Sequence, residues 1–205
     1  MFEITKVSPD EVSGYSHLYY CGWSEEELKN YEMDCQTIFL GTIKDAIFKI
    51  VMNDTEVYHI VFRAGESLRS QVRWIFETSQ STLVVHVNGN IYRFHLLHRQ
   101  YLDSHCYAKV LFDNTSNMQN LSPFLLSEVS PDEKMMVVID TEGVAVLNWE
   151  KVLWKRSLEW AYADYVRIRE VSNSSVVIFC NPPDENKKQM AFDIFTGIRM
   201  ISNVR

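Results

Sequence analysis

Hydrophobic residues in this chain gather into four short hairpins, each a pair of apolar runs around a polar turn. The hairpins cover four ranges: 46–63, 83–97, 135–149 and 176–192. Their turns centre near four residues: Asp54, Gly89, Glu142 and Asp184. The spacings between these turns are 35, 53 and 42 residues, and a four-stranded propeller blade repeats every ~40 to 45 residues. The pattern therefore predicts a scaffold built from repeated β-meander units.

The second hairpin carries the clearest turn signal. Asn88 and Gly89 stand between two alternating apolar runs, and this dipeptide suits the positive φ angles of a two-residue type I′ turn. Such a turn pairs Val85 with Tyr92 across the two strands. In the third hairpin, Gly143 is expected to supply the positive φ of its turn.

Taken together, the hairpins predict an all-β protein of about fourteen short antiparallel strands. Repeated meander units of this length favour a small or partial β-propeller. A two-sheet β-sandwich is the alternative, because evenly spaced short strands and turns fit both architectures. We expect a single domain over residues 1–205. A candidate internal boundary or insertion lies at 113–130, where loop-forming Asn and Ser residues interrupt the pattern.

One short helix is expected near the N-terminus. Ser24 is followed by Glu25, Glu26 and Glu27, and a Ser with a Glu three residues later is the signature of a capping box. Acidic side chains also stabilise the positive end of a helix. The sequence therefore predicts a helix from about Glu25 to Tyr31.

Two short segments resemble repeats of β-propeller families. The segment from Ser130 to Glu133 and the apolar residues after it are similar to the turn-then-strand opening of WD-type blades. The segment from Asp193 to Gly197 is similar to the Asp-x-x-Thr-Gly turn of quinoprotein-type repeats. The resemblance implies a meander of antiparallel strands. It implies no cofactor, because none of a quinone enzyme's metal or ring contacts can be matched to residues here.

Charge is concentrated at the start of the chain. Residues 1–35 hold eight acidic residues against two lysines, a net charge of −6, whereas the other 170 residues have a net charge of −1. Tyrosines and a tryptophan interleave with these carboxylates. Such a segment repels nucleic acid, whose affinity for proteins comes from Lys and Arg. A basic protein would be attracted to it, with the aromatic residues as anchors.

The candidate partner-binding residues all come from this acidic, aromatic segment: Tyr19, Tyr20, Trp23, Glu25, Glu26, Glu27 and Tyr31. A simpler interpretation stays open, in which the acids only cap and solvate a helix and the aromatic residues pack beneath it. The regional imbalance of charge is what favours an interface.

Metal and catalytic motifs are not recognisable in the sequence. His95, His98, His105 and Cys106 lie within twelve residues. In an extended strand, however, residues at odd separation point to opposite faces. His95 and His98 are therefore expected to face apart. We predict no catalytic residue, no metal ligand and no cofactor.

The remaining features concern the compartment. No apolar run approaches the ~18 residues of a membrane-spanning helix, and the first residues lack the pattern of a secretion signal. The four cysteines are scattered without metal-binding spacing, which is typical of reduced, buried thiols. We therefore expect a cytoplasmic protein with no membrane contact.

Three functions fit these observations. The preferred hypothesis is a non-catalytic protein that binds another protein. Its most concrete form is an immunity-type inhibitor that occludes a basic toxin, such as a nuclease, with its acidic aromatic surface. The alternatives are an enzyme with its site in the funnel of the β structure and a structural subunit of an assembly. The sequence leaves the oligomeric state open.

Overall fold

Four small β-sheets make up the described part of this protein. The computed structural model describes nine ranges: 1–12, 17–24, 45–64, 71–88, 90–102, 126–139, 143–157, 166–180 and 188–200. Within them, sixteen strands form four sheets of four strands each. We name these sheets A to D in chain order. The one helical element described is a 3-10 turn at Pro9–Glu11, in which the Glu11 carboxylate accepts hydrogen bonds from the backbone N–H and hydroxyl of Ser8.

Three of the sheets are simple antiparallel meanders, in which each strand pairs with the next one along the chain. Sheet B consists of β5 (Val72–Glu77), β6 (Thr82–Val87), β7 (Asn90–His95) and β8 (Gln100–Tyr101). Sheet C consists of β9 (Leu126–Val129), β10 (Met136–Ile139), β11 (Gly143–Leu147) and β12 (Val152–Ser157). Sheet D consists of β13 (Val166–Val171), β14 (Ser175–Cys180), β15 (Lys188–Asp193) and β16 (Arg199–Met200).

Sheet A departs from this order. Its strands are arranged as β1 (Phe2–Val7), β3 (Ala46–Met52), β4 (Glu56–Phe62) and β2 (His17–Cys21). The strand β2 thus occupies the outer edge and runs parallel to β4. This is the one parallel pairing among the described strands. A parallel neighbour requires a long connection rather than a tight turn.

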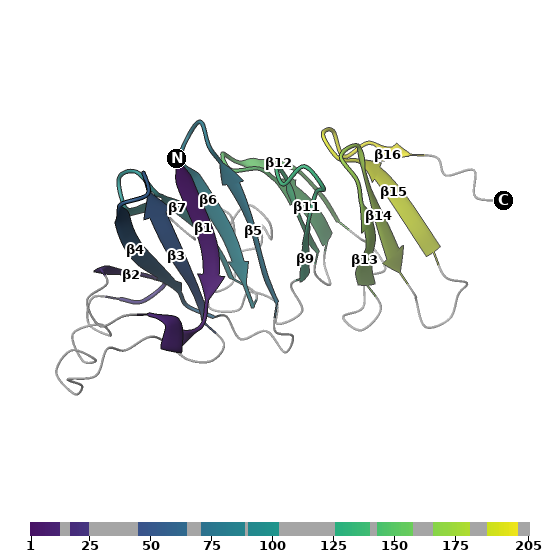
Figure 1. Ribbon diagram of the computed structural model, residues 1–205. Coiled ribbons are helices and arrows are strands. Elements are labelled where there is room, and N and C mark those ends of the chain that lie inside the picture. Colours follow the sequence, from purple (N-terminus) through teal and green to yellow (C-terminus); the bar gives the residue numbers. More distant parts are fainter. Residues whose placement is uncertain are drawn as a thin grey trace.

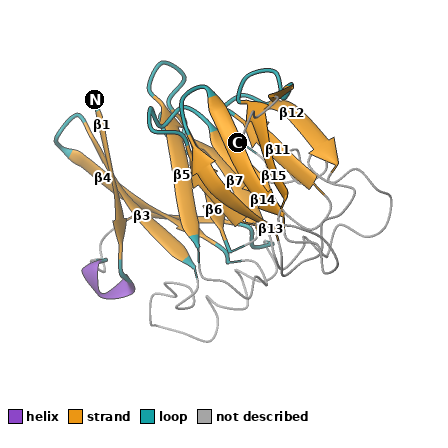
Figure 2. Cartoon of the chain, turned by 90° about the vertical axis from the view of Figure 1, so that its right-hand side faces the viewer, coloured by secondary structure: helices purple, strands orange, loops and turns teal. Residues whose placement is uncertain are grey.

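The sheets are stacked face to face in chain order. Figure 1 shows them in a row from A to D, and Figure 2, turned by 90°, shows B, C and D lying one behind another. One apolar cluster joins A to B, a second joins B to C and a third joins C to D. The first strands of sheets B, C and D are β5, β9 and β13. They follow the same order, because β9 lies beside both β5 and β13. Within the described ranges, these blade-like units form an open row that is not closed into a propeller ring.

Alternation along the inner strands explains the stacking. In β6 all six residues are buried, because odd positions such as Leu83 and Val85 face sheet A whereas Val84 faces sheet C. In β10, Val138 faces sheet B and Val137 faces sheet D. Strands that are buried on both faces have continuous apolar runs, and this explains the apolar central hairpins of sheets B and C.

The four predicted hairpins are confirmed. They are the central pairs of the four sheets: β3–β4, β6–β7, β10–β11 and β14–β15. The predicted register is also confirmed, since Val85 pairs with Tyr92 and Val87 with Asn90. The first hairpin turns through Asn53 and Asp54, both with positive φ. Four sheets rather than two exclude the two-sheet sandwich.

Some local expectations were wrong or fall outside the described residues. Gly143 does not have a positive φ. It begins β11, where a Cβ would lie 2.5 Å from the carbonyl oxygen of Arg156, so glycine is needed for close approach of two strands. The predicted helix from Glu25 to Tyr31 lies outside the described residues, as does most of the candidate boundary at 113–130.

Both segments that resemble propeller repeats form turns. At Ser130, the hydroxyl donates to Asp132 and accepts from the backbone N–H of Met135, immediately before β10. At Asp193, one carboxylate oxygen accepts three hydrogen bonds from the following turn. Both segments therefore form hydrogen-bonded turns beside strands of the blade-like sheets. No helix among the described residues is long and apolar enough to span a membrane.

The ends of the strands define an upper and a lower edge of the stack. The described turns at 78–81, 130–135 and 172–174 join the first two strands of sheets B, C and D, and they lie at the upper edge in Figure 1. Because successive strands alternate in direction, β5 and β13 begin at the lower edge. Cys21, the last residue of β2, is also at the lower edge. It pairs with Phe62, the last residue of β4, which lies at the end of β4 opposite to the turn at 53–55.

Candidate functional site

The strand β2 places the predicted tyrosines on opposite faces of sheet A. Tyr19 pairs with Ile60, and Tyr20 pairs with Val61. The Tyr19 ring packs into the interface with sheet B, with its centroid 5.5 Å from that of Tyr58 and 5.9 Å from that of Phe94. Tyr20 points to the outer face of sheet A, because neighbouring residues in a strand alternate. The structure therefore packs the partly buried Tyr19 against the core between sheets A and B and separates it from Tyr20.

Tyr20 and Trp23 meet at the lower end of β2. Their rings are edge to face with centroids 5.7 Å apart, and the guanidinium of Arg63 lies 5.9 Å from the centroid of Trp23. Arg63 is held by hydrogen bonds from its backbone N–H to the Cys21 carbonyl and from its side chain to the Gly22 carbonyl. We call Tyr20, Trp23 and Arg63 the Trp23 corner. Both residues are half-buried.

Gly22 permits this corner to form. Its φ is +97°, a conformation that L-residues with side chains rarely adopt. A Cβ at this position would lie 2.7 Å from the hydroxyl of Tyr92. That hydroxyl donates to the Arg63 carbonyl at 2.6 Å. The chain therefore turns away from β2 in close contact with sheet B, and this contact fixes the position of Trp23.

The other predicted interface residues cannot be placed relative to this corner. Glu25, Glu26, Glu27 and Tyr31 lie outside the described residues. In the chain they follow directly after Ser24, an exposed residue next to Trp23. The Trp23 corner is thus the described beginning of the acidic, aromatic segment.

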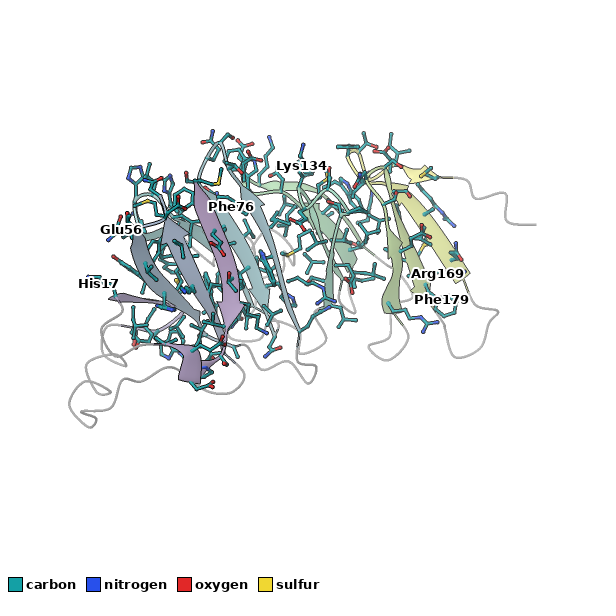
Figure 3. The ribbon with its side chains drawn as sticks, in the orientation of Figure 1. His17, Glu56, Phe76, Lys134, Arg169 and Phe179 are labelled. Carbon is teal, nitrogen blue, oxygen red and sulfur yellow. The ribbon has the colours of Figure 1, made fainter. Side chains whose placement is uncertain are left out.

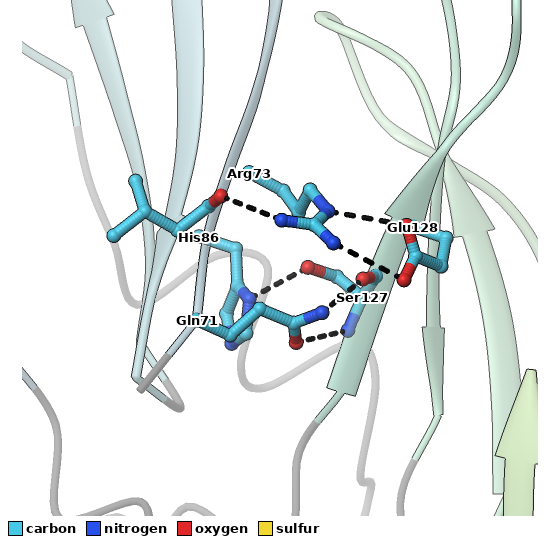
Figure 4. Close-up of polar contacts among 6 residues, drawn as sticks. Gln71, Arg73, His86, Ser127 and Glu128 are labelled. Carbon is cyan, nitrogen blue, oxygen red and sulfur yellow. Dashed lines mark hydrogen bonds and ion pairs between the residues drawn. The ribbon is translucent and has the colours of Figure 1, made fainter. Parts of the chain in front are cut away.

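A second polar cluster lies between sheets B and C, and the sequence did not reveal it (Figure 4). The Oγ of Ser127 and the Nδ1 of His86 are joined by a hydrogen bond of 2.6 Å. The side-chain amide of Gln71 donates to the Ser127 carbonyl at 2.7 Å and accepts from the Ser127 N–H at 2.9 Å. Arg73 and Glu128 form an ion pair with an Nε–Oε2 distance of 3.1 Å. We call these five residues the B–C seam.

Burial determines the chemistry of this seam. His86 and Ser127 are both 0% exposed. Burial, with a smaller contribution from the positive charge of Arg73, lowers the pKa of His86 to about 3. A Ser–His contact resembles the start of a nucleophilic dyad, but substrate cannot reach this pair. Its role is to satisfy polar groups while it joins two sheets.

The prediction that His95 and His98 face apart was wrong. Their rings stack with centroids 4.3 Å apart, and Nδ1 of His95 accepts a hydrogen bond from the His98 backbone N–H. The strand ends at His95 and a turn follows, so the alternation of an extended strand no longer applies. His105 and Cys106 lie outside the described residues. Within the described ranges, no three His, Cys, Asp or Glu side chains are placed to hold a metal ion.

One further histidine is buried without a hydrogen bond. His59 is 2% exposed, and neither ring nitrogen has a hydrogen-bond partner within the described ranges. Burial, together with the charge of Lys49, lowers its pKa. The neutral ring therefore packs as part of the outer face of sheet A, near the apolar Ile47 and Val61.

Comparison with known protein families and with curated proteins finds no match to this chain.

Proposed function

We propose that this protein is a non-catalytic binding protein that holds a basic partner protein through the Trp23 corner and the acidic residues that follow it. One observation supports this most directly. Tyr20 and Trp23 are half-buried aromatic residues whose rings contact each other at the end of β2, with Arg63 beside Trp23. The chain continues from them into Glu25, Glu26 and Glu27.

Rigid aromatic groups beside a dense charge are the usual elements of a strong interface. Aromatic side chains that are already ordered lose little entropy on binding, so they serve as anchors. Carboxylates around such an anchor attract a positively charged surface and accelerate its association. Residues 1–35 have a net charge of −6, which favours a basic partner and disfavours nucleic acid.

The most concrete form of the proposal is an immunity-type inhibitor. Its partner would be a basic toxin domain, such as a nuclease, whose substrate-binding surface must attract phosphate. An acidic surface competes for the same positive charge, so one interface provides both affinity and inhibition. In this form the protein acts in the cytoplasm, where the toxin would act.

The test compares charge reversals at opposite edges of the molecule. Glu25, Glu26 and Glu27 are changed together to Lys, and a matched control changes Glu77, Glu133 and Glu150, which lie at the upper edge. Both variants alter the net charge equally. The partner captured by the parent chain is identified, and its binding rates are measured at low and high salt. We expect the first variant to lower the association rate at low salt by about tenfold or more, and the control to change it little.

Substitution of the aromatic residues separates anchoring from attraction. Trp23→Ala should mainly raise the dissociation rate, because it removes a buried contact without altering charge. Circular dichroism confirms that each variant is folded. If the triple reversal binds the same partner as fast and as tightly as the parent over the whole salt range, the acidic segment is only a solvated cap and the proposal is wrong.

A further inference from the structure

The outer face of sheet D differs from every other large sheet face in the described part of the protein. The two faces of B and of C and the inner face of A pack against neighbouring sheets. On the outer face of A, Ile47 and Val61 are buried. On the outer face of D, by contrast, Arg167 and Glu170 are exposed and Val177, Phe179 and Ala191 are half-buried. Sheet D ends the row in Figure 1.

The register of sheet D arranges this face in two rows. In the first row Arg167 pairs with Phe179, and Phe179 pairs with Gln189. The guanidinium of Arg167 lies over the Phe179 ring, 4.7 Å from its centroid, and Arg169 donates a hydrogen bond to Gln189. Figure 3 shows Arg169 and Phe179 together on this sheet.

The second row has the opposite charge. A bulge after Ile168 shifts the pairing, so that Glu170 pairs with Val177 and Val177 pairs with Ala191. Without the bulge, Glu170 would point to the inner face, because residues alternate along a strand. The bulge therefore brings a carboxylate to the outer face, level with two small apolar residues.

The two rows are complementary to each other. If a second sheet D is turned end for end and laid on the first, Arg167 lies against Glu170 of the other copy and Phe179 lies against Val177. The same contacts then occur twice, once on each side of a two-fold axis, as in the commonest class of homodimer. We propose that the outer face of sheet D is a self-association surface that takes a second copy of this chain in this arrangement.

The stacking within the chain supports this occupant. Sheets A to D already pack face to face through apolar clusters, so the dimer continues an existing mode of packing. The face measures roughly 20 Å by 15 Å from strand dimensions, about 300 Å² per copy, which is well below the ~800 Å² per partner of a stable complex. The dimer should therefore be weak and depend on concentration.

The experiment uses two single reversals on the full chain. Sedimentation equilibrium should show the parent shifting from 24.0 kDa towards twice that mass as its concentration rises. Arg167→Glu and Glu170→Arg should each raise the dimer dissociation constant by about tenfold or more. In each variant the side chains at positions 167 and 170 carry the same charge, so both of the contacts between these positions in the dimer become repulsive. In an equimolar mixture of the two variants, every contact is again between opposite charges. We expect the mixture to recover the affinity of the parent.

Two further variants test the apolar contacts. Phe179→Asp should abolish the dimer, whereas Ile198→Asp, at a position that is 64% exposed on a turn outside the two rows, should leave it intact. Circular dichroism establishes that each variant is folded. A parent that stays monomeric up to about 1 mM overturns the proposal. So do single reversals that still dimerise, or a mixture that does not recover.

Discussion

Single polar residues carry much of the specificity of this stack. Most contacts between sheets are apolar, and many apolar arrangements have similar energies. The B–C seam differs, because His86 and Ser127 must meet to avoid leaving buried polar groups unpaired. Such a loss costs about 1–3 kcal/mol for each group. The seam therefore favours one alignment of sheet B on sheet C over shifted alternatives.

The buried histidine should make stability depend on pH. Burial, and then Arg73, lowers the pKa of His86 to about 3 in the folded protein, whereas the unfolded chain takes up this proton near pH 6.5. The unfolded state thus binds more protons below pH 6.5, so the stabilising contribution is complete above that pH and is lost as the pH falls towards 3. We expect the parent to lose about 2 kcal/mol more than His86→Gln between pH 7 and pH 5.

Urea unfolding at both pH values measures this difference. His59 and His95, whose pKa values are also lowered, are present in both chains, so their effects cancel. The Arg73–Glu128 ion pair is likewise shared. Equal pH dependence in parent and variant would show that His86 is already accessible to protons in the folded state.

At the scale of elements, turns lock the outer strands in place. In the turn after β15, the Asp193 carboxylate accepts from both the backbone N–H and the hydroxyl of Thr196, and these bonds lower its pKa. The buried indole N–H of Trp154, from sheet C, donates to the Ile194 carbonyl at 2.7 Å. This turn therefore links sheet D to sheet C as well as β15 to β16.

Gly197 should be the residue in this turn that tolerates substitution least. Its φ is +66°, and a Cβ would lie 2.5 Å from the Trp154 ring. Gly197→Ala should lower the free energy of unfolding by roughly 2 kcal/mol, through backbone strain and displacement of the indole. Urea unfolding followed by tryptophan fluorescence measures the loss. The exposed Ile198→Ala is the control and should change stability little; equal losses in the two variants would contradict this account.

Local and non-local features differ in how well the sequence predicted them. The hairpin around Asn88 was predicted correctly, because the turn signal and the alternation of apolar residues both depend on residues that are close together in the sequence. The parallel position of β2 was not, because it depends on where the chain returns after a long connection. The regional charge predicts that Tyr19 and Tyr20 belong to the same surface. Only the pairing with β4 shows that they face opposite sides.

The B–C seam could not be predicted either, because its residues come together only in the folded protein. Gln71 and His86 lie far from Ser127 in the sequence, and none of the three belongs to a recognisable motif. The stacking of His95 on His98 has a different cause: residues alternate only within a strand, and β7 ends at His95. In both cases, the contact between two residues can be predicted only once the ends of the strands are known.

At the scale of the whole molecule, the central sheets tie the stack together. B and C are each packed on both faces, so unfolding either one exposes the clusters of both its neighbours. Apolar burial of this kind makes unfolding cooperative. The chain could nevertheless divide between B and C, where the undescribed range 103–125 connects them.

Hydrogen exchange can distinguish one unit from two. We expect the amides of β6 in sheet B and β10 in sheet C to exchange only through global unfolding, with free energies that agree within about 0.5 kcal/mol. A double variant, Gln71→Ala with Arg73→Ala, removes two side chains of the B–C seam and should lower both values together. Arg169→Ala, which removes only an exposed hydrogen bond to Gln189, serves as the control. If β6 exchanges well before β10, or the seam variant affects one sheet alone, then A–B and C–D are separate folding units, and the seam is an interface between them.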